Sequence, residues 1–295
     1  MRYDPYNALI APARTSASLW HLAIGIVAFV VFYFGLTIVN LAVNAFILGA
    51  AGSTEPVESQ MLARTSLSAL LALFSFGFAI LALHFTLRMV HNRTLIGLIG
   101  PLPAAITLFR RICIALLILH AVLFYLPTDE TLALESNLPA GEWLILLPLG
   151  LLGLLIQTSA EELLFRGYLQ SQLAARFSHP AIWIIVPSVL FGLLHYDTEI
   201  NGANTWLVVG WAVLFGIAAA DLTARSGSLA PAIALHFINN FFAILIASPG
   251  GYFDGLSLYT YPFAMDDTEA ALKWAPVEML LMLCAWLAAR LAMRR

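Results

Sequence analysis

Three ionisable residues stand close together inside a long apolar stretch of the chain: Glu161, Glu162 and Arg166. Ionisable groups at membrane depth are costly, so they usually mark a functional site. If the stretch is helical, Glu162 and Arg166 are one turn apart, in the acid-before-base order that favours an ion pair. Glu161 is then rotated by about 100° from Glu162. We expect Arg166 to hold Glu162 in a supporting role and Glu161 to act as a general base; the reverse assignment of the two carboxylates stays open.

Two further motifs carry histidine in later apolar runs. Phe191 and His195 are four residues apart, so the phenyl ring and the imidazole can stack on one helix face. His236 and Asn240 are also four residues apart and face the same way. A carboxylate without a cationic partner in apolar surroundings binds a proton more readily than in water, which suits Glu161 for activating a water molecule. His195 could share that task or bind a metal. His236 and Asn240 each have an N–H donor that could stabilise an oxyanion.

Other chemistries leave weaker traces in the sequence. There is no His-Glu-x-x-His zinc helix and no Gly-x-Ser-x-Gly nucleophile turn. No cofactor is required by the pattern; if a divalent metal such as zinc is present, its ligands would be Glu161, His195 and His236. Structural interpretations stay open as well, because a Glu–Arg pair can be a simple bridge and polar side chains can join helices within a membrane.

The composition indicates the elements that must position these residues. The chain has 295 residues, 61% hydrophobic and 11% charged, with a mean hydropathy of +0.88, whereas a soluble domain has about 25% charged residues. Several apolar runs reach the roughly 18 to 20 residues that a membrane-spanning helix needs. The sequence therefore predicts an all-α, polytopic membrane bundle of about eight transmembrane helices with the active site in an intramembrane cavity. The expected spans are 19–50, 65–90, 108–127, 143–174, 181–196, 205–222, 228–247 and 271–293.

The charges between the spans test this count. The stretch 91–107, with Pro101 and Pro103, is expected to be a loop and a surface segment, and no strand is predicted. One set of connections carries Arg2, Arg14, Arg88, Arg93, Arg110, Arg111, Arg176, Arg225, Arg290, Arg294 and Arg295. The alternate set carries Glu55, Glu58, Asp129, Glu130, Glu135, Asp197, Glu199, Asp254, Asp266, Asp267 and Glu269, with only Arg64 and Lys273 as cations. This bias predicts that both termini are cytoplasmic.

Domain organisation and partners follow from the same features. The chain lacks an internal repeat, which disfavours a transporter built from two halves, and it lacks a long polar linker. We therefore expect one transmembrane domain, 1–295, whose catalytic core is about 143–247. No basic tract indicates a nucleic-acid partner. The expected surroundings are the lipid bilayer.

Taken in order, the three motifs closely resemble those of the CAAX-protease and bacteriocin-processing (CPBP or ABI) family, a group of intramembrane endopeptidases that includes the type II CAAX prenyl endopeptidase. That pattern is Glu-Glu-x-x-x-Arg, Phe-x-x-x-His and His-x-x-x-Asn, here at 161–166, 191–195 and 236–240. The resemblance covers about 155–245. It implies that Glu161 and His195 activate the attacking water and that His236 and Asn240 form the oxyanion hole. The family has been described both as metalloproteases and as glutamate proteases, which leaves the metal open.

The resemblance implies an enzyme, an intramembrane peptidase of the glutamate or metallo type. Its substrate would be a membrane-embedded or lipidated peptide, with a prenylated CAAX peptide as the example from one branch of the family. Its expected location is a bacterial inner (plasma) membrane, as an integral, multi-pass protein. The alternative is a non-catalytic bacteriocin-immunity or scaffold protein that retains the family fold.

Overall fold

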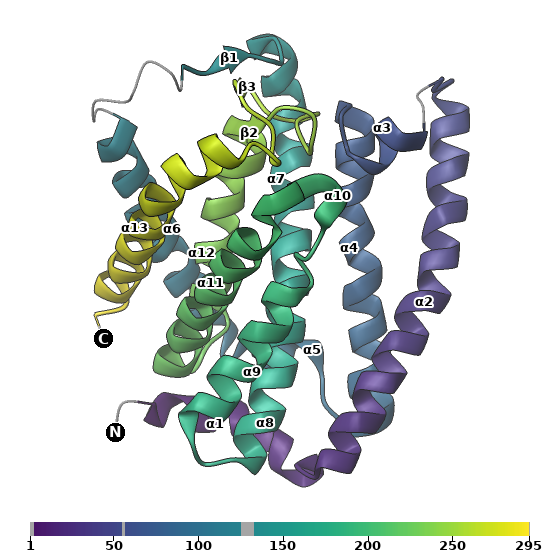
Figure 1. The fold of residues 1–295 in the computed structure, drawn as a ribbon. Coiled ribbons are helices and arrows are strands. Elements are labelled where there is room, and N and C mark those ends of the chain that lie inside the picture. Colours follow the sequence, from purple (N-terminus) through teal and green to yellow (C-terminus); the bar gives the residue numbers. More distant parts are fainter. Residues whose placement is uncertain (1–2, 55–56, 125–132, 295) are drawn as a thin grey trace.

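The computed structural model describes residues 3–54, 57–124 and 133–294, and long helices standing roughly side by side dominate it (Figure 1). The α-helices are α1 (Asn7–Ile10), α2 (Leu19–Ala50), α3 (Val57–Met61), α4 (Ser66–Thr86), α5 (Leu95–Ile99), α6 (Leu102–Phe124), α7 (Ala140–Glu162), α8 (Gln170–Arg176), α9 (Pro180–Leu193), α10 (Thr198–Asn201), α11 (Thr205–Ser226), α12 (Ala230–Asn240) and α13 (Thr268–Met293). The strands are β1 (Glu135–Ser136), β2 (Ala247–Pro249) and β3 (Tyr259–Tyr261).

Helix length and composition agree with a membrane-spanning bundle. In the described part of the chain, 6 helical segments are long and apolar enough to cross a bilayer: Leu19–Ala50, Ser66–His91, Leu102–Leu123, Ala140–Arg176, Thr198–Ser226 and Thr268–Met293. Two shorter apolar helices, Pro180–Leu193 and Ala230–Ile246, fall on the fifth and seventh expected spans. The predicted fold class, an all-α polytopic bundle, is confirmed, and its helical segments are compatible with about eight spans.

Two details of the expected elements are wrong. The third span was expected from 108, but α6 already begins at Leu102. Pro103 then lies in the first turn of the helix, where a missing backbone N–H costs nothing, so a proline there starts the helix rather than preventing it. The expectation of no strands also fails: β3 pairs antiparallel with β1 and parallel with β2. These strands have only two or three residues, too few for a periodic pattern, and they lie at the upper end of the molecule in Figure 1.

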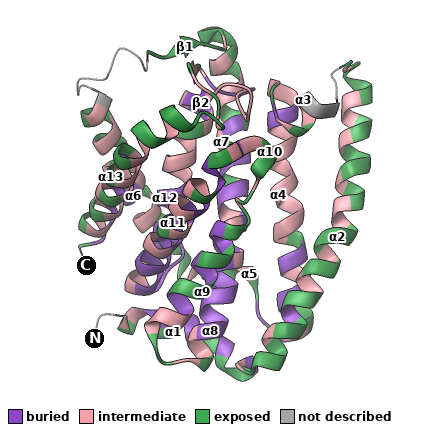
Figure 2. Cartoon of the chain, viewed as in Figure 1, coloured by how far each residue is buried: buried purple, intermediate pink, exposed green. Residues whose placement is uncertain are grey.

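Burial is concentrated in the helices that carry the motifs. Only 6% of the most apolar window of α2 is buried, compared with 56% for the segment that contains α11. Figure 2 shows the same contrast, with α2 largely exposed and α7, α8, α11 and α12 rich in buried residues. Since the exposed residues of α2 are mostly apolar, this helix suits a lipid-facing position, while the motif helices form the interior.

A glycine allows α11 to approach the first motif closely. A Cβ on Gly216 of α11 would lie 2.9 Å from the Cβ of Ser188 on α9 and 3.0 Å from Nη2 of Arg166. Contacts this short would force a shift, so the absence of a side chain here lets α9, α11 and Arg166 meet. The pairing of α9 with α11 is the most extensive between any two elements described.

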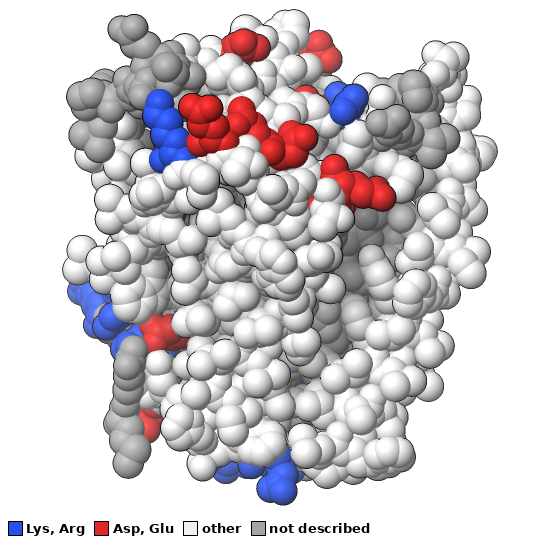
Figure 3. Space-filling view, viewed as in Figure 1, with Lys and Arg blue, Asp and Glu red and all other residues white. Residues whose placement is uncertain are grey.

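Charged side chains separate towards the two ends of the bundle. In Figure 3 acidic residues gather near the upper end, most Lys and Arg lie lower, and a broad uncharged band lies between them. Arg64 and Lys273 are the cations expected among the acidic connections. Other parts of that expectation, on Arg2, Glu55, Asp129, Glu130 and Arg295, lie outside the described residues.

Candidate active site

The first and third motifs both stand where an α-helix passes into a π-helical turn. Glu161 and Glu162 end α7, and the turn Leu163–Leu169 follows; His236 and Asn240 lie on α12, which is followed by the π-helical turn Phe241–Ile246. Such turns are rare and are frequently found at functional sites, although a third one, Leu87–His91, follows α4 outside the three motifs. The helices α7 and α12 pack directly against each other, and His236 lies within 2.8 Å of Glu162 and 3.5 Å of Glu161, so the two motifs meet inside the bundle.

Two carboxylates and a guanidinium surround one imidazole. Arg166 donates from Nη1 to Oε1 of Glu162 over 3.1 Å, and Nδ1 of His236 lies 2.8 Å from the same oxygen. On the other side of the ring, Nε2 of His236 lies 3.5 Å from Oε2 of Glu161. Relative exposure is 1% for the Arg166 side chain and 0% for Glu162, against 19% for Glu161. The predicted Glu162–Arg166 pair is thus present, and Glu161 is the more accessible carboxylate.

The contacts of His236 restrict where protons can be. Oε1 of Glu162 already accepts from Arg166, so the short contact to His236 is a bond that Nδ1 donates. In a neutral imidazole Nε2 then has a lone pair, which would face the lone pairs of Glu161. The charges of Glu161, Glu162 and Arg166 also sum to one uncompensated negative charge, which is costly in an apolar interior. A cationic group or a donor between Glu161 and His236 would remove both problems.

Aromatic rings shape the walls of this cluster. The Arg166 guanidinium lies 4.3 Å from the ring centroid of Phe191, a cation–π distance. The Phe191 ring also lies edge-on to His236, with centroids 6.0 Å apart, and Phe215 of α11 approaches the same imidazole at 4.9 Å. Phe191, which the sequence predicted as a supporting residue stacked on His195, therefore contacts all three motifs.

His195 lies just beyond the end of α9 and is only partly buried. Its ring stacks at a tilt on Phe191, 4.8 Å between centroids, as predicted. Nδ1 donates to the carbonyl oxygen of Phe191 over 3.0 Å, which leaves Nε2 as the acceptor nitrogen. Within the described residues no hydrogen bond or ion pair joins His195 to Glu161. Shared activation of water by these two residues stays a prediction.

The metal ligands considered from the sequence are not gathered as a ligand set. In residues 3–54, 57–124 and 133–294, no group of three or more His, Cys, Asp or Glu side chains is arranged to hold a metal ion. Glu161 and His236 approach each other, whereas no contact joins His195 to either of them among the described residues. The arrangement therefore lacks the third protein ligand that a catalytic zinc site usually has.

Asn240 belongs to a row of amides that the sequence analysis did not identify. Its Nδ2 donates to Oε1 of Gln157 over 3.0 Å, and Nδ2 of Asn239 donates to its Oδ1 over 3.1 Å. Gln157 lies on α7, four residues before Glu161, and is buried. A polar residue one helical turn from the candidate base, in an apolar run, was the signal that could have revealed it.

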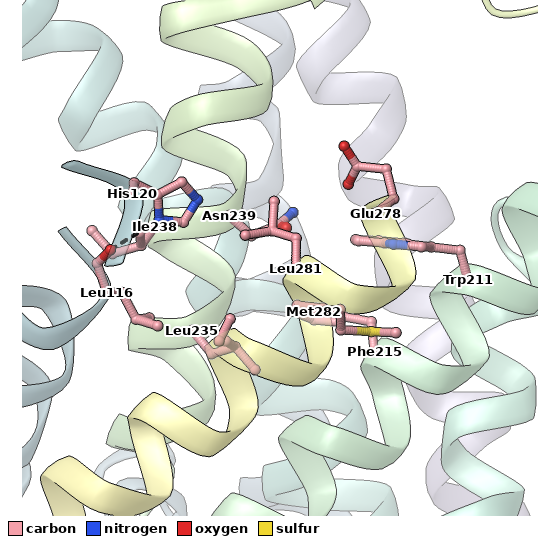
Figure 4. Close-up of a pocket in the computed structure, with 11 residues that line it drawn as sticks. Leu116, His120, Trp211, Phe215, Leu235, Ile238, Asn239, Glu278, Leu281 and Met282 are labelled. Carbon is pink, nitrogen blue, oxygen red and sulfur yellow. Dashed lines mark hydrogen bonds between the residues drawn. The ribbon is translucent and has the colours of Figure 1, made fainter. Parts of the chain in front are cut away.

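A small cavity of about 10 Å³ lies beside α12, between α6, α11 and α13. Figure 4 shows Asn239 at this cavity together with His120, Trp211 and Glu278. A volume of this size holds about one water molecule. The cavity is separate from the contacts of Glu161 and His236, but Asn239 belongs to both its wall and the row of amides.

Comparison with known proteins agrees with the three motifs. Residues 142–242 match the family described as type II CAAX prenyl endopeptidase Rce1-like. This segment contains every motif residue, so the resemblance inferred from the sequence is confirmed over it. Together, this match and the apolar helices identify the chain as an integral, multi-pass membrane protein with a segment similar to that family.

A relative from Bacillus subtilis (strain 168), the uncharacterized protein YyaK, is 31% identical over 140 residues. The match covers 46% of each protein, so the chain spans less than half the length of that relative. The comparison with solved structures gives no significant match.

Proposed function

We propose that this protein is an intramembrane endopeptidase that hydrolyses a peptide bond in a membrane-associated substrate. The observation that carries the proposal is the cluster in which His236 lies between Glu161 and the Arg166-bound Glu162. The family that matches residues 142–242 suggests prenylated CAAX-type peptides as the substrate class.

Glu161 is the general base of the proposed reaction. It takes a proton from a water molecule, whose oxygen attacks the carbonyl carbon of the scissile amide. The carbonyl electron pair moves to oxygen, and negative charge develops there as Glu161 becomes neutral. When the C–N bond breaks, Glu161 returns the proton to the departing nitrogen, so the products are a carboxylic acid and an amine and the enzyme is unchanged.

In this proposal one additional proton on His236 makes the step electrically balanced. With the proton on His236, Glu161 is an ionised base and the imidazolium is a donor beside it. Proton uptake by Glu161 then leaves one positive charge in the cluster, which offsets the developing oxyanion. His236 and Asn240 provide the N–H groups for that oxyanion, and His195, whose Nε2 is an acceptor, assists in orienting the water.

The test is cleavage of a quenched fluorescent farnesylated CAAX peptide by the purified protein in detergent. Glu161→Gln keeps the size of the side chain but removes its basicity, and we expect a loss of about 10²- to 10⁴-fold in kcat. Glu142→Gln is the matched control, the same change at an exposed carboxylate in the first turn of α7, and should leave kcat unchanged. Normal cleavage by Glu161→Gln would overturn the proposal.

Two further arms address substrate and metal. A peptide of the same sequence without the farnesyl group shows whether the lipid is required, and a chelator shows whether a metal contributes. The non-catalytic alternative, an immunity or scaffold protein, predicts that Glu161→Gln retains full biological activity.

For orientation, we propose a bacterial inner (plasma) membrane with both termini cytoplasmic. The separation of acidic and basic residues supports it (Figure 3). Labelling of single cysteines introduced at Asn7 and Arg294 by a membrane-impermeant reagent tests it: both should react only after the membrane is opened.

A further inference from the structure

Three amide side chains form a hydrogen-bonded row from α12 to α7. Asn239 donates from Nδ2 to Oδ1 of Asn240 over 3.1 Å, and Asn240 donates from Nδ2 to Oε1 of Gln157 over 3.0 Å. The row starts at the small cavity beside α13 (Figure 4) and ends on the helix that carries Glu161. Asn239 and Gln157 thus contact opposite ends of the Asn240 amide.

This arrangement gives the Asn240 amide one direction. The last side-chain torsion of asparagine is broad and roughly two-fold, so an isolated Asn240 could present either Oδ1 or Nδ2 to a ligand. Asn239 brings a donor to the oxygen, and Gln157 brings an acceptor to the nitrogen. A flip of Asn240 alone would face donor with donor and acceptor with acceptor, losing both bonds.

The direction matters for the proposed chemistry. An oxyanion is stabilised only by an N–H donor, whereas the amide oxygen would repel it. Nδ2 has two N–H groups, and one of them is used by Gln157, which leaves the other for a ligand. Gln157 is placed for this task because it lies one helical turn before Glu161, on the same face of α7.

We propose that Gln157 is a positioning residue for the hydrolytic reaction: it orients the Asn240 amide so that an N–H group points to the oxyanion of the tetrahedral intermediate. The inference rests on the proposed function and extends it to a residue outside the three motifs. Gln157 acts through Asn240 and does not itself contact the reacting atoms.

A double-mutant cycle on peptide cleavage tests this. Gln157→Met keeps a side chain of similar length but removes the acceptor, and we expect kcat to fall about 10- to 100-fold with KM unchanged, less than the 10²- to 10³-fold cost of deleting an oxyanion donor. Asn240→Ala should reach that larger cost. In the Asn240→Ala background, Gln157→Met should cause no further loss, since its partner is absent.

Two variants keep the test independent of folding. Thr158→Val changes the neighbouring buried residue, whose hydroxyl donates only to carbonyl oxygens of its own helix, and should leave kcat unchanged. Asn239→Leu removes the donor at the other end of the amide and should lower kcat in the wild-type background but not beside Asn240→Ala. Thermal unfolding in detergent confirms that each variant is folded.

Each remaining outcome contradicts the inference. An unchanged kcat in Gln157→Met means that Gln157 has no part in orienting Asn240. Equal losses in both backgrounds mean that it acts independently of Asn240. If Asn240→Ala cleaves normally while Glu161→Gln does not, the inference and the oxyanion role of Asn240 both fail, while hydrolysis with Glu161 as base survives. Normal cleavage by Glu161→Gln overturns the inference and the proposed function together.

Discussion

His91 and His236 are both buried histidines, 3% and 5% exposed, yet their partners differ in charge. Around His91 the partners are neutral: Nδ1 lies 2.8 Å from the Ser16 hydroxyl and 2.6 Å from Nε2 of Gln172, and Nε2 lies 2.8 Å from the Tyr168 hydroxyl. The amide nitrogen of Gln172 can only donate, so Nδ1 of His91 accepts and Nε2 carries the proton. His91 is therefore a neutral histidine with both ring nitrogens satisfied.

His236 has a carboxylate at each ring nitrogen instead. Carboxylates accept, and an imidazole can donate to two acceptors only when it is protonated on both nitrogens. The two sites show that burial of a histidine is no guide to chemistry by itself. What separates them is the charge of the partners, because only the carboxylate site gains from holding or moving a proton.

The largest expected effect is at His236. His236→Gln retains a donor towards Glu162 but cannot carry the second ring proton that the proposed mechanism requires, so we expect cleavage to slow by about 10²- to 10⁴-fold. Single-turnover cleavage measures this without interference from product release. His91→Gln is the matched control, the same change at a buried neutral histidine, and should leave the rate unchanged. Equal losses in the two variants would show that the charge of the partners does not distinguish the sites.

The second prediction concerns stability at the same cluster. Arg166→Met leaves Glu162 buried with an uncompensated charge, which should lower the free energy of unfolding by about 3–5 kcal/mol. Replacing both partners, as in Glu162→Leu with Arg166→Met, should recover most of that loss, since a buried pair can often be exchanged for apolar groups. Denaturation in mixed micelles measures both. A fully active double variant would assign the pair to structure alone.

The charged part of the candidate site could be predicted because ionisable residues stand out in apolar runs. Glu162 and Arg166 pair as their spacing indicates, and His236 meets them from another helix. The direct approach of His236 to Glu161 could not be read from spacing, because it depends on how α7 packs against α12. His195 was expected beside Glu161, and that expectation still has no test.

The uncharged part was missed for the same reason. Gln157 and Phe215 contact motif residues; a phenyl ring in an apolar helix gives no distinct signal, and the amide of Gln157 gives only its position one turn before Glu161. The helix count, in contrast, follows from the length of apolar runs, which the bilayer thickness dictates. Short features could not be predicted from run length: the π-helical turns after α7 and α12 and the small sheet depend on local packing rather than on composition.

A smaller effect is expected in the neutral network around His91. Tyr168→Phe removes the hydroxyl that pairs with Nε2 of His91 and leaves a buried donor unsatisfied. We expect a loss of about 1–3 kcal/mol in the free energy of unfolding with an unchanged rate of cleavage by folded protein. Ser171→Ala, which removes an acceptor of Arg93 in the same region, should behave alike. Reduced kcat without destabilisation would mean that the network belongs to the catalytic site.

The smallest effect is expected at a third histidine, His21, which is exposed near the start of α2. Its Nδ1 lies 2.7 Å from the hydroxyl of Ser18, a neutral partner. Both side chains are exposed, so water can replace this hydrogen bond when the ring is removed. The helix cap is a separate bond, from the backbone N–H of His21 to Oγ of Ser18, and survives truncation of the ring. His21→Ala should therefore change stability by no more than about 0.5 kcal/mol and leave cleavage unchanged, as measured beside His91→Gln and His236→Gln. We expect the loss of stability to be smallest for His21→Ala and larger for the two buried histidines, because burial determines the effect on stability. We expect the rate of cleavage to fall only for His236→Gln, because an effect on rate requires charged partners. A slower rate in His21→Ala would contradict this distinction.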